Sequence, residues 1–385
     1  MEYNFDQVLN RLNTHSVKWD AYPPDVLPMW IADMDLKAPP AVMQALEKRV
    51  QHGIFGYECE YRELKRVFMQ WAAEHYSWHI SAEDIVIIPG VVTGLNLAVQ
   101  SLGQPGDGLL IQTPVYPPFF EIAPHAGMIT VKSPLTAYAD GYYGIDIEKL
   151  ELAITPQTRF LILCNPHNPV GRVFTQNELA AIAEVCVRKD LVIISDEIHC
   201  DFLYDDRRHT PIASLGQQIA ERTITLMAPS KTFNIAGLKC SFMIIQDAQL
   251  RSKIENGKKG LVGCPSVLSL EAAWAAYAQG ADWLQQALIY LQANRDFLVS
   301  FIRQEIPRIK VFSPEATYLA WLDCRDFADK VNPCEYFLNE AKIAFNDGKA
   351  FGSGAEGFIR MNFGCPRTVL EQALNRMKKA VLELN

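Results

Sequence analysis

Long apolar runs and basic clusters are both missing from this chain of 385 residues. No segment reaches the roughly 18 consecutive apolar residues that a membrane-spanning helix needs, so we expect no span. No block of Lys and Arg is longer than a pair such as Lys258-Lys259, and the formal net charge is −8, which argues against a nucleic-acid-binding surface. The first residues, Met1 to Asp6, are acidic and lack an apolar segment, so we expect no secretory signal.

Paired cysteine motifs are missing as well. The nine cysteines are an odd number, include no Cys-x-x-Cys pair, and several lie in apolar runs, as Cys164, Cys186 and Cys240 do. This pattern predicts reduced, buried thiols in a cytoplasmic protein rather than a disulfide framework. His75 and His79 stand four residues apart without an acidic ligand set nearby, so a structural or surface role is favoured over a metal site.

The sequence does contain an alternation of apolar strands and helices. Strands are expected at 85–88, 108–112, 160–164, 191–195 and 223–227, and helices at 40–52, 61–76, 91–102 and 177–189. Helix 61–76 places six residues on one stripe at helical spacing: Leu64, Val67, Phe68, Trp71, Ala72 and His75. This alternation favours a parallel sheet of βαβ units. From about residue 282 a long helix leads to strands near 309–312, 318–322 and 358–363, which predict a smaller second lobe.

Lys231 is the most informative single residue. It follows a β-rich run, Thr223 to Met227, and lies beside Ser230 and a glycine-bearing turn. An ammonium group buried at such a place loses hydration, which lowers its pKa and makes the neutral amine available for Schiff-base chemistry.

Three further segments place polar side chains next to buried strands. Asp196 ends the apolar run that begins at Leu191, at the edge where open α/β sheets bind ligands. Asn168 lies between Pro166 and Pro169, where two X-Pro steps favour an extended path that presents amide side chains. Arg360 stands in the apolar segment 357–363, and a guanidinium group there is suited to bind a carboxylate through two hydrogen bonds.

Along the chain the four segments follow the order Asn168, Asp196, Lys231 and Arg360. In this order they resemble the fold-type I enzymes that use pyridoxal 5′-phosphate (PLP), the aspartate aminotransferase superfamily. Residues 27–35, 53–57 and 195–199 are closer still to its cystathionine β-lyase, or C–S lyase, branch of the MalY/PatB type. The resemblance spans nearly the whole chain, from Ser16 to Arg367.

The resemblance implies an α/β fold with a large lobe, in which a mostly parallel sheet of the seven-stranded type lies between helices, and a smaller α/β lobe built from both chain ends. The boundaries it implies are 1–38 for an amino-terminal segment that joins the small lobe, 39–282 for the large PLP-binding domain and 283–385 for the carboxyl-terminal small domain.

The resemblance also assigns residues to the cofactor's ring. Lys231 would bind PLP covalently, and Asp196 would keep the ring nitrogen protonated so that the ring accepts electrons. Asn168 would donate to the phenolic oxygen and Tyr116 would stack on the ring, the alternatives being a turn asparagine and a packed loop aromatic. His199 stands where many relatives carry a tyrosine bonded to that oxygen, and a packing role is an equal alternative.

A phosphate is expected at the turn 89–94, because a helix amino-terminus directs unpaired N–H groups and its dipole toward an anion. Val92 and Thr93 would donate N–H groups, and Ser230 and Lys239 match other phosphate contacts of the superfamily. Tyr57 matches a tyrosine that reaches the neighbouring subunit's phosphate, which implies a homodimer with shared active sites.

For the substrate, the resemblance implies an amino-acid thioether whose carboxylate docks on Arg360 and on backbone near Ala32. The implied activity is α,β-elimination of cystathionine, cysteine or cysteine S-conjugates to a thiol, pyruvate and ammonia, within sulfur amino-acid metabolism. Because the same lysine, aspartate and arginine would also serve transamination, an aminotransferase is the alternative. A PLP-binding regulatory protein without turnover is the third possibility. No metal, nucleic-acid or membrane partner is expected.

Overall fold

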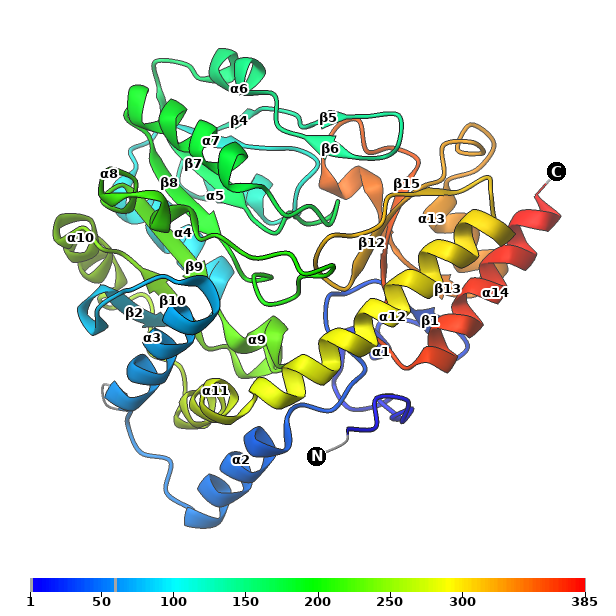
Figure 1. Cartoon of the computed structure of the whole chain (residues 1–385), viewed down its shortest axis with the longest axis horizontal. Helices are drawn as coiled ribbons and strands as arrows, with labels where there is room; N and C mark the ends of the chain where they lie inside the picture. The colour runs from blue at the N-terminus through cyan, green and yellow to red at the C-terminus, as the bar shows by residue number, and fades with distance from the viewer. Residues whose placement is uncertain (1–2, 59–60, 385) are drawn as a thin grey trace.

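A seven-stranded sheet forms the centre of the larger part of the molecule (Figure 1). The computed structural model describes residues 3–58 and 61–384. The strands lie in the order β2 (Ile85–Ile88), β10 (Ser241–Ile244), β9 (Thr223–Met227), β8 (Val192–Asp196), β7 (Thr158–Cys164), β3 (Gly108–Ile111) and β4 (Ile129–Lys132). All neighbouring pairs are parallel except the two that β10 makes with β2 and β9. The predicted mostly parallel sheet is confirmed.

Helices cover both faces of this sheet, because its central strands are apolar on both sides. One face packs against α4 (Val91–Leu102), α5 (Phe119–His125) and α10 (Ala248–Lys258). The other packs against α3 (Arg62–Tyr76), α6 (Ile147–Ala153), α7 (Gln176–Arg188) and α11 (Val267–Gln279), and α2 (Pro40–His52) lies against α11. The carboxyl ends of β7, β8 and β9 therefore meet along one edge of the sheet.

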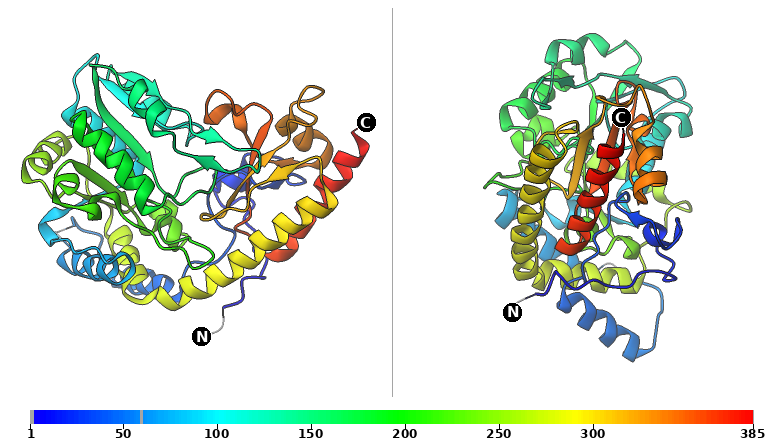
Figure 2. Two further views of the ribbon diagram at one scale, coloured as in Figure 1. Left: turned by 45° about the horizontal axis from the view of Figure 1, so that its top comes forward. Right: turned by 90° about the vertical axis from the view of Figure 1, so that its right-hand side faces the viewer.

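A second, smaller sheet lies beside the first and is antiparallel throughout. Its strands follow the order β11 (Lys310–Val311), β12 (Leu319–Asp323), β15 (Phe358–Asn362) and β14 (Asn346–Asp347). The amino-terminal segment joins this part through β1 (Leu27–Pro28), which pairs in parallel with β13 (Ile343–Ala344). In Figure 2 the long helix α12 (Ala281–Glu305) runs from the larger sheet to the smaller one, where α14 (Arg367–Glu383) lies next to it.

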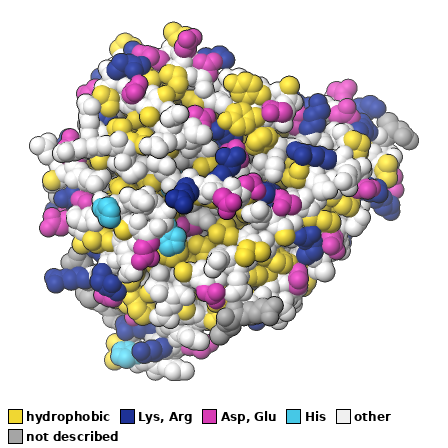
Figure 3. All heavy atoms as spheres, in the orientation of Figure 1, with side chains coloured by type: hydrophobic (Ala, Val, Ile, Leu, Met, Phe, Trp, Pro, Cys, Tyr) yellow, Lys and Arg dark blue, Asp and Glu magenta, His cyan; other side chains and the backbone are white. Residues whose placement is uncertain are grey.

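The remaining α-helices and strands of the described chain are short. They are α1 (Val17–Asp20), β5 (Thr136–Ala137), β6 (Tyr143–Gly144), α8 (Gln217–Ala220), α9 (Pro229–Thr232) and α13 (Pro333–Tyr336). None of the described helices is long and apolar enough to cross a bilayer. On the face drawn in Figure 3, basic and acidic side chains are interspersed.

The expected helix α2 begins at Pro40 and ends before Gly53, whose φ of 77° is left-handed. The side chain of His75 is exposed at the end of α3 and stacks on the Trp71 ring, with 3.7 Å between ring centroids, which agrees with the predicted structural or surface role. The rest of the expected stripe on α3 is buried.

The described cysteines form no disulfides. Cys164, Cys186 and Cys240 are buried, and Cys59 lies outside the described residues. Within residues 3–58 and 61–384, no group of three or more His, Cys, Asp and Glu side chains is arranged to hold a metal ion.

Candidate active site

One cavity of about 580 Å³ collects nearly all of the predicted site residues. It lies where the carboxyl ends of β7 and β8, the turn α9, the start of α4 and strand β15 approach one another. The predicted residues that line it are Ala32, Val92, Thr93, Tyr116, Asn168, Asp196, His199, Ser230, Lys231, Lys239 and Arg360. The larger sheet, the smaller sheet and the amino-terminal segment thus each contribute to one site.

Lys231 extends from α9, just past the end of β9, into this cavity. Its Nζ donates a hydrogen bond of 2.6 Å to the Ala32 carbonyl oxygen. Loss of hydration and the neighbouring Arg360 charge lower the pKa of the amine to about 8. A substantial fraction of a lysine with this pKa is neutral near physiological pH, as nucleophilic and basic roles require.

Asp196 is the last residue of β8 and is 4% exposed. Its Oδ1 accepts a 3.1 Å hydrogen bond from the Ile198 N–H. No basic side chain of the described residues forms an ion pair with it. Burial raises the pKa of this carboxyl group to about 7, against the opposing effects of that hydrogen bond and of Lys231. A cationic N–H group brought to Asp196 would supply its missing counter-charge.

Arg360 projects from β15 and is held by neutral acceptors. Its two terminal nitrogens donate to Asn168 Oδ1 (2.9 Å), Asn346 Oδ1 (2.6 Å) and the Trp30 carbonyl oxygen (3.2 Å). Its Nε is buried without a hydrogen-bond partner, and no carboxylate of the described residues forms an ion pair with it. Burial lowers its pKa to about 10. The guanidinium group is oriented and still lacks an anion.

The amino-terminus of α4 faces the same cavity. Its N-cap, Gly90, has a φ of 124° and provides no side-chain cap, so the first N–H groups of the helix are available to an anion. Gly94 brings the helix close to the sheet, because a Cβ there would lie 2.5 Å from Ile88 Cδ1 and 2.5 Å from Leu226 Cδ2. Ser230 and Lys239 line the cavity as well.

His199 and Tyr116 lie between these groups. His199 is buried, and its Nδ1 has no hydrogen-bond partner within the described residues. Burial, with the charges of Lys231 and Arg360, holds the pKa of His199 well below its usual value, so the ring is neutral. Burial raises the pKa of the half-buried Tyr116 phenol.

Several residues that support the site were missed in the sequence. The Asn362 amide donates 2.7 Å hydrogen bonds to the Ile31 and Asp33 carbonyl oxygens, and Asn234 donates to those of Met34 and Leu36. These bonds fix the segment that carries Ala32. For Asn346, the sequence offered one indication, since the polar pair Asn346-Asp347 directly follows an apolar run.

Tyr57 is the predicted site residue that the cavity does not include. Its side chain is fully exposed in the segment between α2 and α3. A role at a neighbouring subunit's site stays a prediction.

The model of the aminotransferase class I and II family matches residues 24–377. The chain belongs to this family. Within it, cystathionine beta-lyase PatB of Bacillus subtilis is 39% identical, over 98% of this chain and 100% of that protein. Cystalysin from Treponema denticola, whose crystal structure contains a PLP cofactor, has a TM-score of 0.96 at 35% identity over 100% of both chains. The PLP-bound C–S lyase from Staphylococcus hominis has a TM-score of 0.93 at 34% identity over 99% of both.

Proposed function

We propose that this chain is a PLP-dependent carbon–sulfur β-lyase that cleaves cystathionine or related S-substituted cysteines to a thiol, pyruvate and ammonia. The observation that carries the proposal is the 39% identity to a cystathionine β-lyase over 98% of the chain. Similarity to PLP-bound lyase structures over the whole chain supports the choice of cofactor.

The residues of the cavity fit PLP at each end of the cofactor. The uncapped amino-terminus of α4, with Thr93, Ser230 and Lys239, suits the phosphate group. The buried carboxyl group of Asp196 has a raised pKa and lacks a cation, which suits a ring nitrogen that carries a proton. Lys231 would attach the cofactor. Asn168 and the unpaired His199 would face its phenolic oxygen, and Tyr116 would stack on the ring.

When bound, PLP supplies an electron-withdrawing ring that stabilises negative charge at the α-carbon of an amino acid. Arg360 would bind the substrate carboxylate with its oriented guanidinium group, assisted by backbone at Ala32. Lys231, once released from the cofactor, would accept the proton from the α-carbon, which its lowered pKa favours. Asp196 would hold the proton on the ring nitrogen. Cleavage of the C–S bond would then release the sulfur, which takes up a proton to become a thiol, and water would complete the conversion to pyruvate and ammonia.

The test is to incubate the purified, PLP-loaded protein with L-cystathionine in the absence of any 2-oxo acid. We expect free thiol and pyruvate in equal amounts. Dependence on an added 2-oxo acid would instead identify an aminotransferase, and no turnover would indicate a binding protein. Lys231→Ala serves as the control, and it should lose both turnover and the visible absorbance of covalently bound PLP.

We propose a homodimer in which Tyr57 of each chain contributes to the other chain's phosphate site. The exposure of Tyr57, together with that of Ile54 and Phe55, supports this proposal, because exposed apolar groups in one segment favour burial against a partner. We also propose lobes at residues 39–282 and 283–385 with 1–38 joining the second, which the β1–β13 pairing supports. The free cysteines support a cytoplasmic location.

A further inference from the structure

Two residues that follow Lys231 connect its turn to other parts of the site. Thr232 comes next in the chain, is 0% exposed and donates a 2.6 Å hydrogen bond from its Oγ1 to Oδ2 of Asp201. Asn234 donates to carbonyl oxygens of the amino-terminal segment that carries Ala32. The position of Lys231 therefore depends both on the loop after β8 and on the amino-terminal segment. The proposed reaction assigns no role to Thr232 or Asp201.

Asp201 is held in place by α3. Its Oδ1 accepts hydrogen bonds from Trp71 Nε1, at 3.2 Å, and from the hydroxyl of Tyr76. Both donors belong to α3, and Asp201 itself is buried, with 9% of its surface exposed. Because one carboxyl oxygen is bound to α3 and the other to Thr232, the carboxyl group joins that helix to the turn that carries Lys231.

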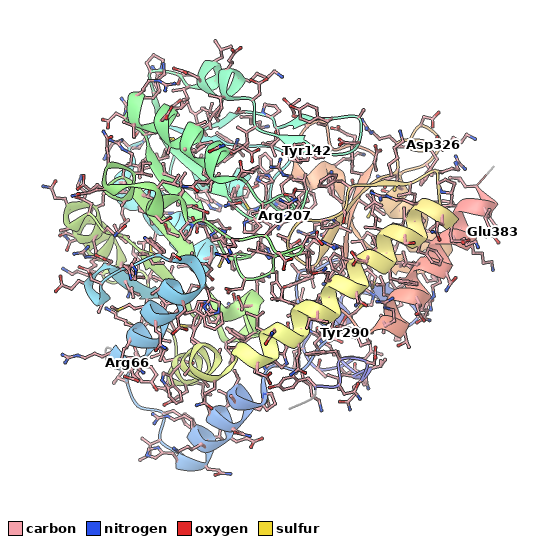
Figure 4. The ribbon with its side chains drawn as sticks, in the orientation of Figure 1. Arg66, Tyr142, Arg207, Tyr290, Asp326 and Glu383 are labelled. Carbon is pink, nitrogen blue, oxygen red and sulfur yellow. The ribbon has the colours of Figure 1, made fainter. Side chains whose placement is uncertain are left out.

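The loop that contains Asp201 begins at Asp196, the last residue of β8. Backbone hydrogen bonds of 3.1 Å within residues 197–202 fold this connection into tight turns. Arg207, labelled in Figure 4, lies further along the loop and pairs with Glu315 at 2.8 Å. The loop is thus anchored on both sides of Asp201, so a shift of Asp201 relative to α9 would also move Asp196 relative to α9.

We propose that Thr232 and Asp201 are positioning residues for the cofactor, because their hydrogen bond sets the separation between Lys231 and Asp196. This inference rests on the roles proposed above for those two site residues. Lys231 would hold PLP at its aldehyde carbon, and Asp196 would hold the ring nitrogen, which lies directly across the ring. Since the ring is rigid, a change in the separation weakens one of the two contacts. Neither Thr232 nor Asp201 lines the cavity, so both act through their neighbours.

Loss of this bond should change how tightly bound PLP holds its protons. The nitrogen that joins Lys231 to the cofactor (the linking nitrogen) can carry a proton. A proton on the ring nitrogen opposes this, because the two positive charges repel each other. If Asp196 lies farther from the ring nitrogen, the ring proton is held less firmly and the pKa of the linking nitrogen rises. The absorbance of bound PLP, followed as the pH is raised, measures this pKa.

The other groups that act on the linking nitrogen stay the same in this comparison. Besides Asp196, the charges that reach Lys231 are those of Arg360 and Asp33, and the neutral His199 lies in the same cavity. A substitution at Thr232 removes none of these side chains, so a change in the pKa reports their arrangement around the cofactor.

Thr232→Val tests the proposal, because valine has nearly the size of threonine and lacks the hydroxyl group. In the PLP-loaded variant we expect the linking nitrogen to hold its proton about tenfold more tightly than in the parent. Thr232→Ser retains the hydroxyl and should restore the parent's value to within about twofold. The matched control is Thr223→Val, which removes a buried hydroxyl that donates a 2.6 Å hydrogen bond to the Ile219 carbonyl oxygen at the far end of β9.

Exchange of the α-hydrogen of L-alanine with D2O, followed by NMR, measures the position of Lys231 separately. L-Alanine has no leaving group on its β-carbon, and removal of its α-proton is a step that lyases and aminotransferases share. We expect Thr232→Val to slow the exchange at saturating L-alanine by at least about tenfold, because a misplacement of about 1 Å costs up to about a hundredfold. The half-saturating concentration should change by less than about threefold, since Arg360 would still bind the carboxylate.

Two results would overturn the positioning role. One is an unchanged pKa of the linking nitrogen in Thr232→Val. The other is a change in Thr232→Ser or Thr223→Val as large as that in Thr232→Val, because the hydroxyl at this one place would then not matter. Neither measurement requires cleavage of a C–S bond. Failure to cleave cystathionine would therefore contradict the proposed function and leave this inference intact.

Discussion

Lys231, Asp196 and Arg360 are three charged side chains that meet in one cavity, and burial disfavours the charged form of each. Their pKa values are about 8, about 7 and about 10, compared with ordinary values of 10.5, 3.8 and 12.5. Each group would regain its ordinary charge if a ligand supplied the opposite one. A zwitterionic amino acid and a cofactor with a protonated ring together supply those charges.

Asp196→Asn tests the role proposed for the carboxylate. An amide cannot hold the proton on a ring nitrogen by charge, so we expect kcat/KM to fall by about a few hundred- to several thousand-fold. This corresponds to about 3–5 kcal/mol for a buried charge that loses its partner. Steady-state kinetics at saturating PLP provide the measurement. Activity within about fivefold of the parent would show that Asp196 is not the ring's partner.

The stability of the PLP-free protein should depend on pH through the same residue. The pKa of Asp196 is about 7 in the folded chain and 3.8 in the reference state, so between these values the folded chain holds a proton that the unfolded chain has released. Raising the pH from 4 to 7 therefore lowers the free energy of unfolding, by about 3 kcal/mol from this group. Urea unfolding at several pH values, with Asp196→Asn for comparison, should show a smaller decline in the variant. Parallel curves for the two proteins would contradict this assignment.

Among individual site residues, the sequence predicts those that directly follow a buried strand. It misses those whose hydrogen-bond partners are distant in the chain. Asp196 and Lys231 each follow an apolar run, and parallel strands bring such ends to one edge. Asn362 and Asn234 act through backbone carbonyl oxygens of residues 31–36. Nothing in local periodicity indicates these contacts, because each joins residues roughly 200 or more positions apart in the chain.

Helix α4 illustrates how one element positions a binding group. Its amino-terminus reaches the cavity because Gly94 allows the helix to approach β2 and β9 closely. The bounds of this helix, Val91–Leu102, agree with the prediction, since Pro89-Gly90 and Gly103 mark both ends. The end of α3 is different: Ser77 turns the chain away with a φ of 52°, and His75 in the last turn stays exposed.

Gly94→Ala should push α4 away from the sheet, because the added methyl group meets two buried side chains at 2.5 Å. We expect a loss of about 1–3 kcal/mol in stability, together with weaker PLP binding as the helix amino-terminus shifts. Urea unfolding and PLP titration measure the two effects. Gly263→Ala is the control, since nothing lies within 4 Å of a Cβ at that position. Equal PLP affinity in both variants would show that the position of α4 does not control phosphate binding.

For the whole molecule, the proposed exchange of Tyr57 between subunits predicts how variants complement each other. A phenol that donates to a phosphate contributes about 1.5–3 kcal/mol, so Tyr57→Phe should weaken PLP binding by roughly ten- to a hundredfold. Tyr57→Ala and Lys231→Ala should each be poorly active alone. Mixed after subunit exchange, they should regain activity, because one site of the mixed dimer takes Lys231 and Tyr57 from intact chains. If the subunits exchange and activity does not return, Tyr57 does not act across an interface.

The parallel pair of β1 with β13 has a consequence for the order in which the protein is made. Leu27 pairs with Ile343, so the strand that precedes Ala32 has no partner until the ribosome has released almost the entire chain. The larger sheet ends at Ile244 and can assemble while synthesis continues, because domains generally fold as units as they emerge. The wall of the cavity that contains Ala32 can therefore form only after the larger sheet has been synthesised. A ribosome stalled before residue 343 would carry a chain whose Lys231 still lacks its carbonyl acceptor.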